Sequence, residues 1–258
     1  MCLILFSWKA HPRYALVVAA NRDEFHQRPS ATADYWADAP DVLAGRDLQA
    51  GGTWMGITRS GRFAAITNYR EPDAPEIPLE RSRGELVRNF LEGNSAPLPH
   101  AETLLADGEY YRGYNLLMGT PGSLAYVSNR DSRALAVSAG SHGLSNHLLD
   151  TQWPKVRSGR KRLEQILSEE QVEPEALFDL LTDRALTPGE IPEDLETRLA
   201  PEQLMKHYFI VSPVYGTRCS TVLLVGHDRR VTFLERQFGP GGEEQGTQKF
   251  EFRYVEGA

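Results

Sequence analysis

The second residue of the chain, Cys2, has the type and position that most directly suggest chemistry. It follows Met1 and precedes Leu3-Ile4-Leu5-Phe6, a run typical of a buried strand. If Met1 is removed, one carbon atom carries both a thiol and a free α-amino group. The amine titrates at about 7.7–8.0 and the thiol at about 8.5, so the amine can accept the thiol proton at neutral pH. This pattern predicts a nucleophile with its own base, and chance placement of a cysteine is the alternative.

Four polar residues, Asn21, Arg22, Asp23 and Glu24, end the second predicted strand. Because side chains alternate along a strand, Asn21 and Asp23 are expected on one face and Arg22 and Glu24 on the other. Beside Cys2, the cation of Arg22 would favour a thiolate, and the carboxylate of Asp23 could hold the α-amine. A polar strand end with surface ion pairs is the alternative interpretation.

Three further residues, Asn68, Asn146 and Arg218, are candidates for the site. Asn68 ends the strand that returns from a predicted hairpin turn at Arg59-Ser60-Gly61, and Asn146 precedes a predicted helix. Their amides could donate hydrogen bonds to an oxyanion, although an asparagine at a strand end is also common turn chemistry. Arg218 begins an apolar strand, so its guanidinium needs water or a partner at the strand edge, and a cleft is one such edge.

The histidines His142 and His147 raise the question of a metal or haem site. Their spacing matches neither H-E-x-x-H nor a zinc finger, and no C-x-x-C accompanies them, so ordinary surface or turn histidines are favoured and no metal site is predicted. The basic run from Lys155 to Arg162 is typical of a solvated helix face, with binding of a phosphate or propionate group as the alternative.

Composition narrows the class of protein. The 258 residues are 41% hydrophobic, which is enough for a substantial core, and the net charge of −7 argues against general nucleic-acid binding. The absence of a bilayer-length apolar run or a signal peptide predicts a cytoplasmic protein without an integral membrane segment. Two cysteines give no disulfide framework, so Cys219 is expected to be a buried free thiol, and a bridge from it to Cys2 would disable the nucleophile.

The pattern of apolar runs and turns predicts largely antiparallel sheets and two pairs of helices in a single domain over residues 1–258. The predicted strands are Cys2–Trp8, Tyr14–Asn21, Thr53–Thr58, Arg62–Asn68, Tyr114–Gly119, Ser123–Asn129, Ala134–Ser138, Tyr208–Ser212, Ser220–Gly226, Val231–Arg236 and Lys249–Tyr254. The predicted helices are Arg83–Leu91, His100–Ala106, Pro154–Leu167 and Pro174–Thr182.

Several short motifs, in this order, resemble the NRDE-motif family, also called the transport-and-Golgi-organisation family. The resemblance covers nearly the whole chain, and its most specific part is the N-R-D-E string. The matching motifs are Met1-Cys2, Asn21-Arg22-Asp23-Glu24, Gly52-Thr53-Trp54, Thr67-Asn68-Tyr69-Arg70, Gly143-Leu144-Ser145-Asn146, Trp153-Pro154-Lys155 and Tyr215-Gly216-Thr217-Arg218.

Through that family the chain is similar to N-terminal-nucleophile (Ntn) hydrolases of the penicillin V acylase and bile salt hydrolase type. The resemblance implies an α+β fold, a four-layer α-β-β-α sandwich with two largely antiparallel sheets. It also implies roles for six residues: Cys2 is the nucleophile, Arg22 and Asp23 orient it, Asn68 and Asn146 stabilise the oxyanion, and Arg218 lies near the nucleophile. The hydrolases separate the arginine and aspartate by two residues. Here they are adjacent, so both can line one site only with a bulge.

Two functions from different classes follow from the resemblance. The first is a cysteine-nucleophile amide (C–N) hydrolase or acyltransferase, which requires no cofactor. The second is a non-catalytic protein that binds and traffics haem, or an acyl-CoA or lipid, in the same cleft; an oligomeric scaffold is a weaker third. The expected partner is a small molecule with an amide or acyl group, or haem, and the chain could form a homo-oligomer. The residues expected to bind the ligand are Asn21, Glu24, Trp54, Tyr69, His147 and Trp153.

Overall fold

The computed structural model describes residues 2–71, 81–131, 133–183 and 207–255, with the backbone alone at Cys2. The chain forms two compact units that interleave in sequence. Unit 1 comprises Met1–Arg28, Ala139–Leu144 and Asp150–Glu251, and unit 2 comprises Pro29–Ser138, Ser145–Leu149 and Phe252–Ala258. The single domain predicted over residues 1–258 stays a prediction.

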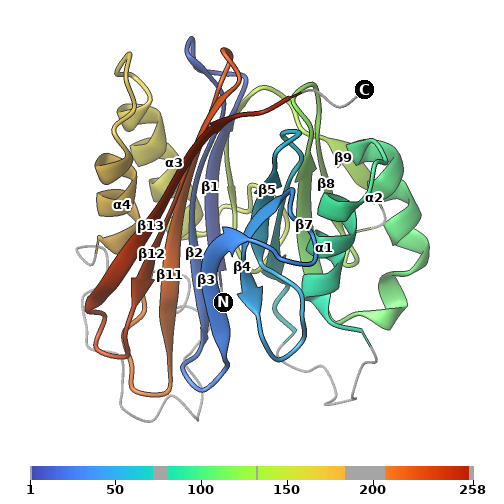
Figure 1. The fold of residues 1–258 in the computed structure, drawn as a ribbon, viewed down its shortest axis with the longest axis horizontal. Coiled ribbons are helices and arrows are strands. Elements are labelled where there is room, and N and C mark those ends of the chain that lie inside the picture. Colours follow the sequence, from blue (N-terminus) through green and yellow to red (C-terminus); the bar gives the residue numbers. More distant parts are fainter. Residues whose placement is uncertain (1, 72–80, 132, 184–206, 256–258) are drawn as a thin grey trace. The chain divides into compact units, whose positions relative to one another are not determined.

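Unit 1 is built on a six-stranded sheet in which the paired strands that have a described register are antiparallel. Its strands, in spatial order, are β10 (Gly140–Leu144), β1 (Cys2–Trp8), β2 (Tyr14–Phe25), β11 (Tyr215–Gly226), β12 (Arg230–Phe238) and β13 (Glu244–Arg253). Helix α3 (Pro154–Ile166) packs on β1 and β10, and α4 (Pro174–Thr182) packs on β2 and β11 (Figure 1). Both helices begin at a proline, whose missing N–H costs nothing at that position.

The core of unit 1 lies between this sheet and its two helices. Leu3 and Leu5 of β1 pack there with Phe178 of α4, and all three side chains are buried. Because strand residues alternate between faces, the odd-numbered residues of β1 face the helices and the even-numbered ones face away from them. This alternation determines which polar side chains of the sheet share a face.

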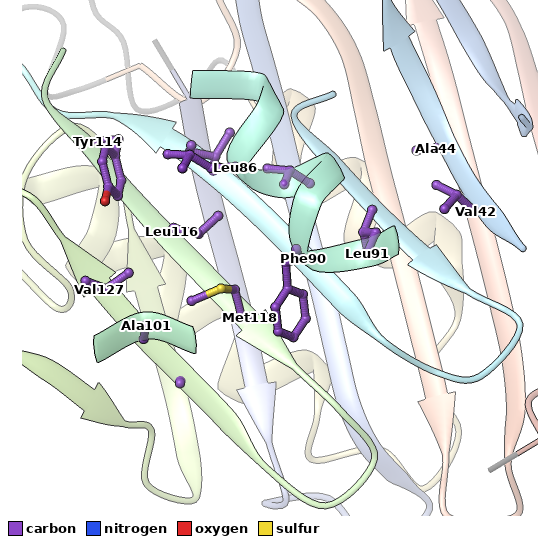
Figure 2. Close-up of a cluster of buried hydrophobic side chains, with 14 of the residues drawn as sticks. Val42, Ala44, Leu86, Phe90, Leu91, Ala101, Tyr114, Leu116, Met118 and Val127 are labelled. Atoms are coloured by element: carbon purple, nitrogen blue, oxygen red, sulfur yellow. The ribbon is translucent and has the colours of Figure 1, made fainter. Parts of the chain in front are cut away.

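Unit 2 is built on a seven-stranded antiparallel sheet. Its strands, in spatial order, are β3 (Ser30–Tyr35), β4 (Val42–Asp47), β5 (Met55–Thr58), β6 (Phe63–Asn68), β7 (Tyr114–Gly119), β8 (Leu124–Ser128) and β9 (Ala134–Ala136). Helices α1 (Arg83–Glu92) and α2 (Pro97–Ala106) pack on this sheet, and a 3₁₀ turn, η1 (Gly108–Tyr110), follows them. Figure 2 shows the resulting core, in which Phe90 and Leu86 of α1 lie over Leu116 and Met118 of β7.

The predicted fold class is confirmed: the chain is α+β, and its described residues form two antiparallel sheets and four α-helices. All four predicted helices are present, and β1 and β7 have the predicted bounds. The prediction was wrong at Tyr208–Ser212, which is an irregular segment and not a strand. Its Ile210 carbonyl accepts a hydrogen bond from the Thr217 N–H of β11, and the Ile210 N–H donates to Thr217 Oγ1. Strands β3, β4 and β10 were missed. In the described residues, no helix is long and apolar enough to cross a bilayer.

Candidate functional site

The backbone register of unit 1 brings the start of the chain beside Arg22. Cys2 of β1 is the register partner of Arg22 in β2, and on its other side Arg22 pairs with Cys219 of β11. Cys219 in turn pairs with Gln237 of β12, so Cys2, Arg22, Cys219 and Gln237 form a row of paired residues across four strands. The side chain of Arg22 is only 6% exposed. A buried guanidinium therefore lies one strand away from the backbone of Cys2.

A β-bulge sits next to this row. Thr217 pairs with Asp23 and Cys219 pairs with Arg22, so Arg218 is an extra residue in β11. A bulge of this kind re-aims a side chain and is common near functional sites. The resemblance to the hydrolases requires a bulge close to Arg22 and Asp23, and the observed one lies opposite them in β11, while β2 runs regularly through both residues.

The bulged residue, Arg218, ties down the turn that follows β2. Its Nη1 donates hydrogen bonds to the carbonyl oxygens of Phe25, His26 and Arg28 at 2.9, 3.1 and 3.2 Å. Burial lowers the pKa of Arg218, and the nearby positive charge of Arg22 lowers it further. Two cations thus lie close together at this end of the sheet, and such a place favours an anion.

One acidic side chain, Glu24, partly balances these cations. Its Oε2 lies 4.0 Å from Nη2 of Arg22 and 3.9 Å from Nε of Arg28. Arg22 and Glu24 share a face of β2, as the alternation predicts. Glu24 therefore lies near two of the arginines at this end of the sheet.

The other face of β2 carries Asn21 and Asp23. Asn21 is 2% exposed and makes three hydrogen bonds: its Nδ2 donates to the carbonyl oxygens of Leu181 and Tyr208 at 3.0 and 2.6 Å, and its Oδ1 accepts from Ser220 Oγ at 2.5 Å. These bonds use the side chain to join the sheet to α4. Asn21 is therefore held as a structural residue.

Asp23 is buried on the same face as Asn21. Its Oδ1 accepts a hydrogen bond from Thr217 Oγ1 at 2.7 Å. Burial raises the pKa of this carboxyl above 3.8, and the Thr217 hydrogen bond and the charges of Lys155 and Arg22 act in the opposite direction. Because Asp23 faces the helices and Arg22 faces away from them, their side chains do not line one face of the sheet.

Two buried charged groups near this row were missed by sequence reasoning. Lys155, assigned to a solvated helix face, is 1% exposed, and that interpretation was wrong for this residue. Glu235 is also 1% exposed; its carboxylate accepts hydrogen bonds from Gln237 Nε2 at 2.7 Å and from Cys219 Sγ at 3.7 Å. The one signal of its burial in the sequence was the alternation along β12, because Glu235 lies on the same face of the strand as the apolar Phe233.

The predicted state of Cys219 is confirmed, since it is a buried free thiol. A bridge to Cys2 conflicts with the topology. The two residues pair with opposite sides of Arg22, so two strand spacings, about 9.6 Å, separate their backbones. A disulfide needs Cα atoms within about 7 Å.

In unit 2, the candidates Asn68 and Asn146 lie together. Asn146 Nδ2 donates to the backbone oxygen of Asn68 at 2.8 Å, and the Arg70 N–H donates to the backbone oxygen of Asn146 at 2.9 Å. In the described part of the chain, the side-chain amide of Asn68 has no hydrogen-bond partner. Asn146 thus braces the end of β6, and the amide of Asn68 is left available.

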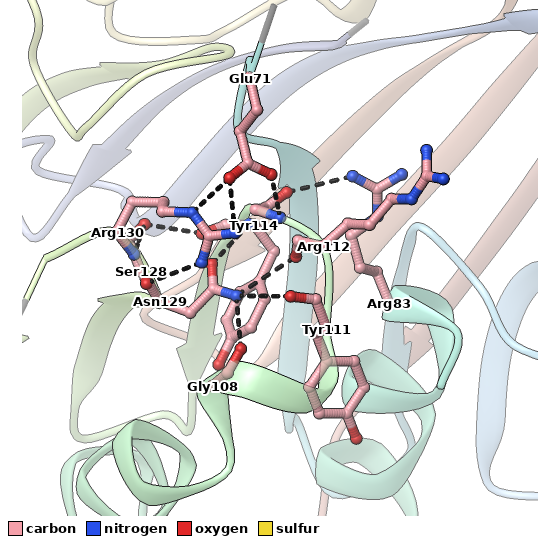
Figure 3. A network of polar contacts seen from close by, with 10 residues as sticks. Glu71, Arg83, Gly108, Tyr111, Arg112, Tyr114, Ser128, Asn129 and Arg130 are labelled. Atoms are coloured by element: carbon pink, nitrogen blue, oxygen red, sulfur yellow. Dashed lines mark hydrogen bonds and ion pairs between the residues drawn. The ribbon is translucent and has the colours of Figure 1, made fainter. Parts of the chain in front are cut away.

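The candidates Tyr69 and His147 form an aromatic pair with ring centroids 5.1 Å apart. The segment after β6 is held in place because the Tyr69 N–H donates to the carbonyl of Gly113 at 2.8 Å. Gly113 is held in turn, because Glu71 accepts a hydrogen bond from the Gly113 N–H at 2.8 Å. Glu71 also accepts from Arg130 Nε at 2.6 Å, and Figure 3 shows these two side chains pointing toward each other. Arg70 is half-buried and, within the described residues, its guanidinium has no ion pair or hydrogen bond.

The remaining candidates are Trp153, Trp54 and His142. Trp153 is the N-cap residue of α3 and packs against the core of unit 1. Trp54 precedes β5 in unit 2, with its ring close to Gly45. His142 is buried in β10 rather than in a surface turn: it stacks on Phe6 and its Nδ1 lies 2.7 Å from Asp150 Oδ2. The described residues contain no cluster of His, Cys, Asp and Glu that could hold a metal ion.

The fold and the register define an α+β protein whose first strand begins at a cysteine paired with a buried arginine. The chain belongs to the Transport and Golgi organisation 2 family, whose profile matches residues 1–240. It is 35% identical over 257 residues to the human Transport and Golgi organization protein 2 homolog, with 92% of each chain covered. It is 36% identical to the homolog from Bos taurus, over 98% of this chain and 99% of that one. The Drosophila melanogaster Transport and Golgi organization protein 2 is 28% identical, over 91% of each chain.

Among solved structures, the chain is similar to the Caenorhabditis elegans N-acylethanolamine-hydrolyzing acid amidase ortholog. The TM-score is 0.47 and the sequence identity is 10%, over 86% of this chain and 92% of that one. Neither value is high enough to indicate a shared function.

Proposed function

We propose that this protein is a cysteine-nucleophile hydrolase or acyltransferase acting on an amide or similar acyl bond, with Cys2 as the nucleophile after removal of Met1. The observation that carries the proposal is the pairing of Cys2 with the buried Arg22. A cation beside a thiol lowers the pKa of the thiol and favours the nucleophilic thiolate. Arg218, whose own pKa reflects the nearness of Arg22, adds to this positive potential.

In the proposed reaction, the thiolate of Cys2 attacks the carbonyl carbon and forms a C–S bond. The α-amino group holds the thiol proton and passes it to the leaving amine as the C–N bond breaks. Water, or a second acceptor, then attacks the thioester and releases the acyl group. The oxyanion requires hydrogen-bond donors. Asn68 and Asn146 lie in the other unit, and their part in this step stays a prediction from the resemblance.

The presence of two cysteines gives the test a matched control. Intact mass first establishes whether Met1 is absent from the purified protein, and retention of Met1 would overturn the proposal. A thiol-directed acylating probe is then expected to add one label to the wild-type protein and to Cys219→Ser, and none to Cys2→Ser. Labelling that survives Cys2→Ser but is lost in Cys219→Ser contradicts the proposal.

The role of Arg22 is tested by the pH dependence of labelling. Arg22→Met keeps much of the side-chain volume and removes the charge, so the midpoint of the pH profile for Cys2 labelling is expected to move to higher pH. Arg157→Met, an exposed arginine on α3, is the control and is expected to leave the midpoint unchanged. Equal profiles for all three proteins would remove Arg22 from the mechanism.

A second candidate function, binding of haem or a similar planar acid, is favoured by one cluster in unit 2. The ring pair of Tyr69 and His147 offers an aromatic surface and an imidazole to serve as axial ligand, and Arg70 carries a guanidinium without a partner in the described residues. A haem titration followed by the Soret band is expected to saturate. His147→Ala should abolish that binding and His142→Ala should not, because His142 is engaged with Asp150. Non-saturating binding, or equal binding by both variants, contradicts this second function.

A further inference from the structure

Strand β13 (Glu244–Arg253) is a long strand with one side open. It ends the strand order of the six-stranded sheet, and no strand of the described chain pairs with its outer side (Figure 1). The six residues from Glu244 to Lys249 are all exposed, whichever face of the sheet they lie on. The strand therefore presents a row of backbone N–H and C=O groups to its surroundings.

An open edge strand can pair with any other extended chain, so proteins seldom leave one of this length uncovered. Proteins commonly shorten such strands, bulge them or cover them. Here the strand is ten residues long, and its protection is limited to charged side chains and to Gly246, whose φ is +141°. The arrangement of those charges indicates what the edge can accept.

Symmetry restricts how two copies of this strand can meet. In an antiparallel pair with a two-fold axis perpendicular to the sheet, directly opposed side chains point to the same face. Two neighbouring residues of one strand point to opposite faces, so they cannot lie directly opposite each other across the axis. The axis must therefore pass through a single position, where a residue of one copy lies opposite the same residue of the other copy. With the axis at Lys249 or at Glu251, two like charges oppose each other, which is destabilising.

With the axis at Phe250, the charges become complementary. Lys249 of one copy then opposes Glu251 of the other, twice per dimer, and the two Phe250 side chains face each other. In a single chain, Lys249 and Glu251 already share a face, with Nζ and Oε1 3.2 Å apart, and both side chains are more than half exposed. They can exchange partners across the axis without rearrangement of the strand.

We propose that β13 is a homodimer interface, in which two copies pair antiparallel about Phe250 and join their six-stranded sheets into one. The pairing covers the backbone of residues 247–253 in both copies and places Lys249 of each copy opposite Glu251 of the other. The inference is independent of the function proposed for Cys2, because it uses only the far edge of the sheet.

The charge pattern makes the interface testable by exchange. The wild-type protein is expected to dimerise in sedimentation velocity between about 1 and 100 µM. Lys249→Glu and Glu251→Lys each place like charges opposite one another at two positions, so each is expected to weaken self-association at least about tenfold. The double variant Lys249→Glu/Glu251→Lys restores complementary pairs and should dimerise like the wild type. A mixture of the two single variants should form heterodimers.

The register is tested by cross-linking. In a Cys219→Ser background, Phe250→Cys places two thiols at the axis, and oxidation is expected to give a covalent dimer. Thr247→Cys is the matched control, because residue 247 does not face its own copy in this register. A monomer at all concentrations overturns the proposal. So does a dimer that both single charge variants leave intact, or a dimer cross-linked equally well through residues 247 and 250.

Discussion

The contrast between Asn21 and Asn68 gives the sharpest stability prediction. Both are polar residues near a strand end that sequence reasoning assigned to the site, but the structure places them in opposite situations. Replacing Asn21 with leucine keeps a similar volume and leaves three buried groups without their partner: the carbonyls of Leu181 and Tyr208 and the hydroxyl of Ser220. At about 1–2 kcal/mol for each group, the variant should lose about 3–6 kcal/mol of its free energy of unfolding.

Asn68→Leu is the matched control, because the partly exposed amide of Asn68 has no hydrogen bond to lose in the described part of the chain. Its free energy of unfolding should fall by less than about 1 kcal/mol. Urea unfolding followed by circular dichroism measures both values, with an unchanged slope as the check that the variants unfold in the same way. A loss below about 1 kcal/mol for Asn21→Leu, or an equal loss for the two variants, would refute the structural role assigned to Asn21.

The ionisation of two carboxyls should change the free energy of unfolding with opposite pH dependence, and one glycine position should be destabilised by any side chain. Burial acts to raise the pKa of Asp150, but hydrogen bonds from His142 and the Gly143 N–H outweigh it, so the pKa lies below 3.8. The stabilisation by Asp150 should therefore be present above pH 3.8 and be lost as the pH falls through the lower folded pKa, and urea unfolding of Asp150→Asn should show a smaller loss in that range. Burial raises the pKa of Asp23, so its ionisation should reduce stability as the pH rises from 3.8 through the folded pKa, and Asp23→Asn should remove that decline in the same assay. Gly45→Ala would bring its Cβ onto the Trp54 ring and should cost about 1–3 kcal/mol and shift tryptophan emission, whereas Gly122→Ala, with open space around it, should change neither.

Most of the elements could be predicted from local pattern. Apolar runs bounded by turn residues located β1 and β7, and a proline at the first helical position located α3 and α4. Two of the three missed strands share a physical reason. β3 (Ser30–Tyr35) and β10 (Gly140–Leu144) contain few large apolar residues, and they are strands because a neighbouring strand supplies hydrogen bonds. The segment Tyr208–Ser212 is the reverse case, since its apolar residues are buried without joining a sheet.

Alternation along a strand correctly separated the side chains of Asn21 and Asp23 from those of Arg22 and Glu24. It left open which pair faces the helices, and that depended on where Leu181, Tyr208 and Thr217 lie after folding. The bulge at Arg218 was equally out of reach, because a bulge is a mismatch between two strands that are nearly two hundred residues apart in the chain. The burial of Lys155 had no local signal, since a lysine in the first turn of a basic helix is ordinarily solvated.

The sequence by itself determined the family, the fold class and the order of the chemistry-bearing residues, because these are carried by local motifs and by hydrophobic periodicity. The tertiary structure alone decided which of those residues do structural work and which are left available. The side chain of Asn21 is engaged in hydrogen bonds with two carbonyls and a hydroxyl. Asn146 stabilises a strand end and Arg218 stabilises a turn, whereas Arg22 lies paired with the backbone of Cys2. The reason is physical: a polar side chain is committed by the partners that folding brings to it, and those partners come from distant parts of the chain.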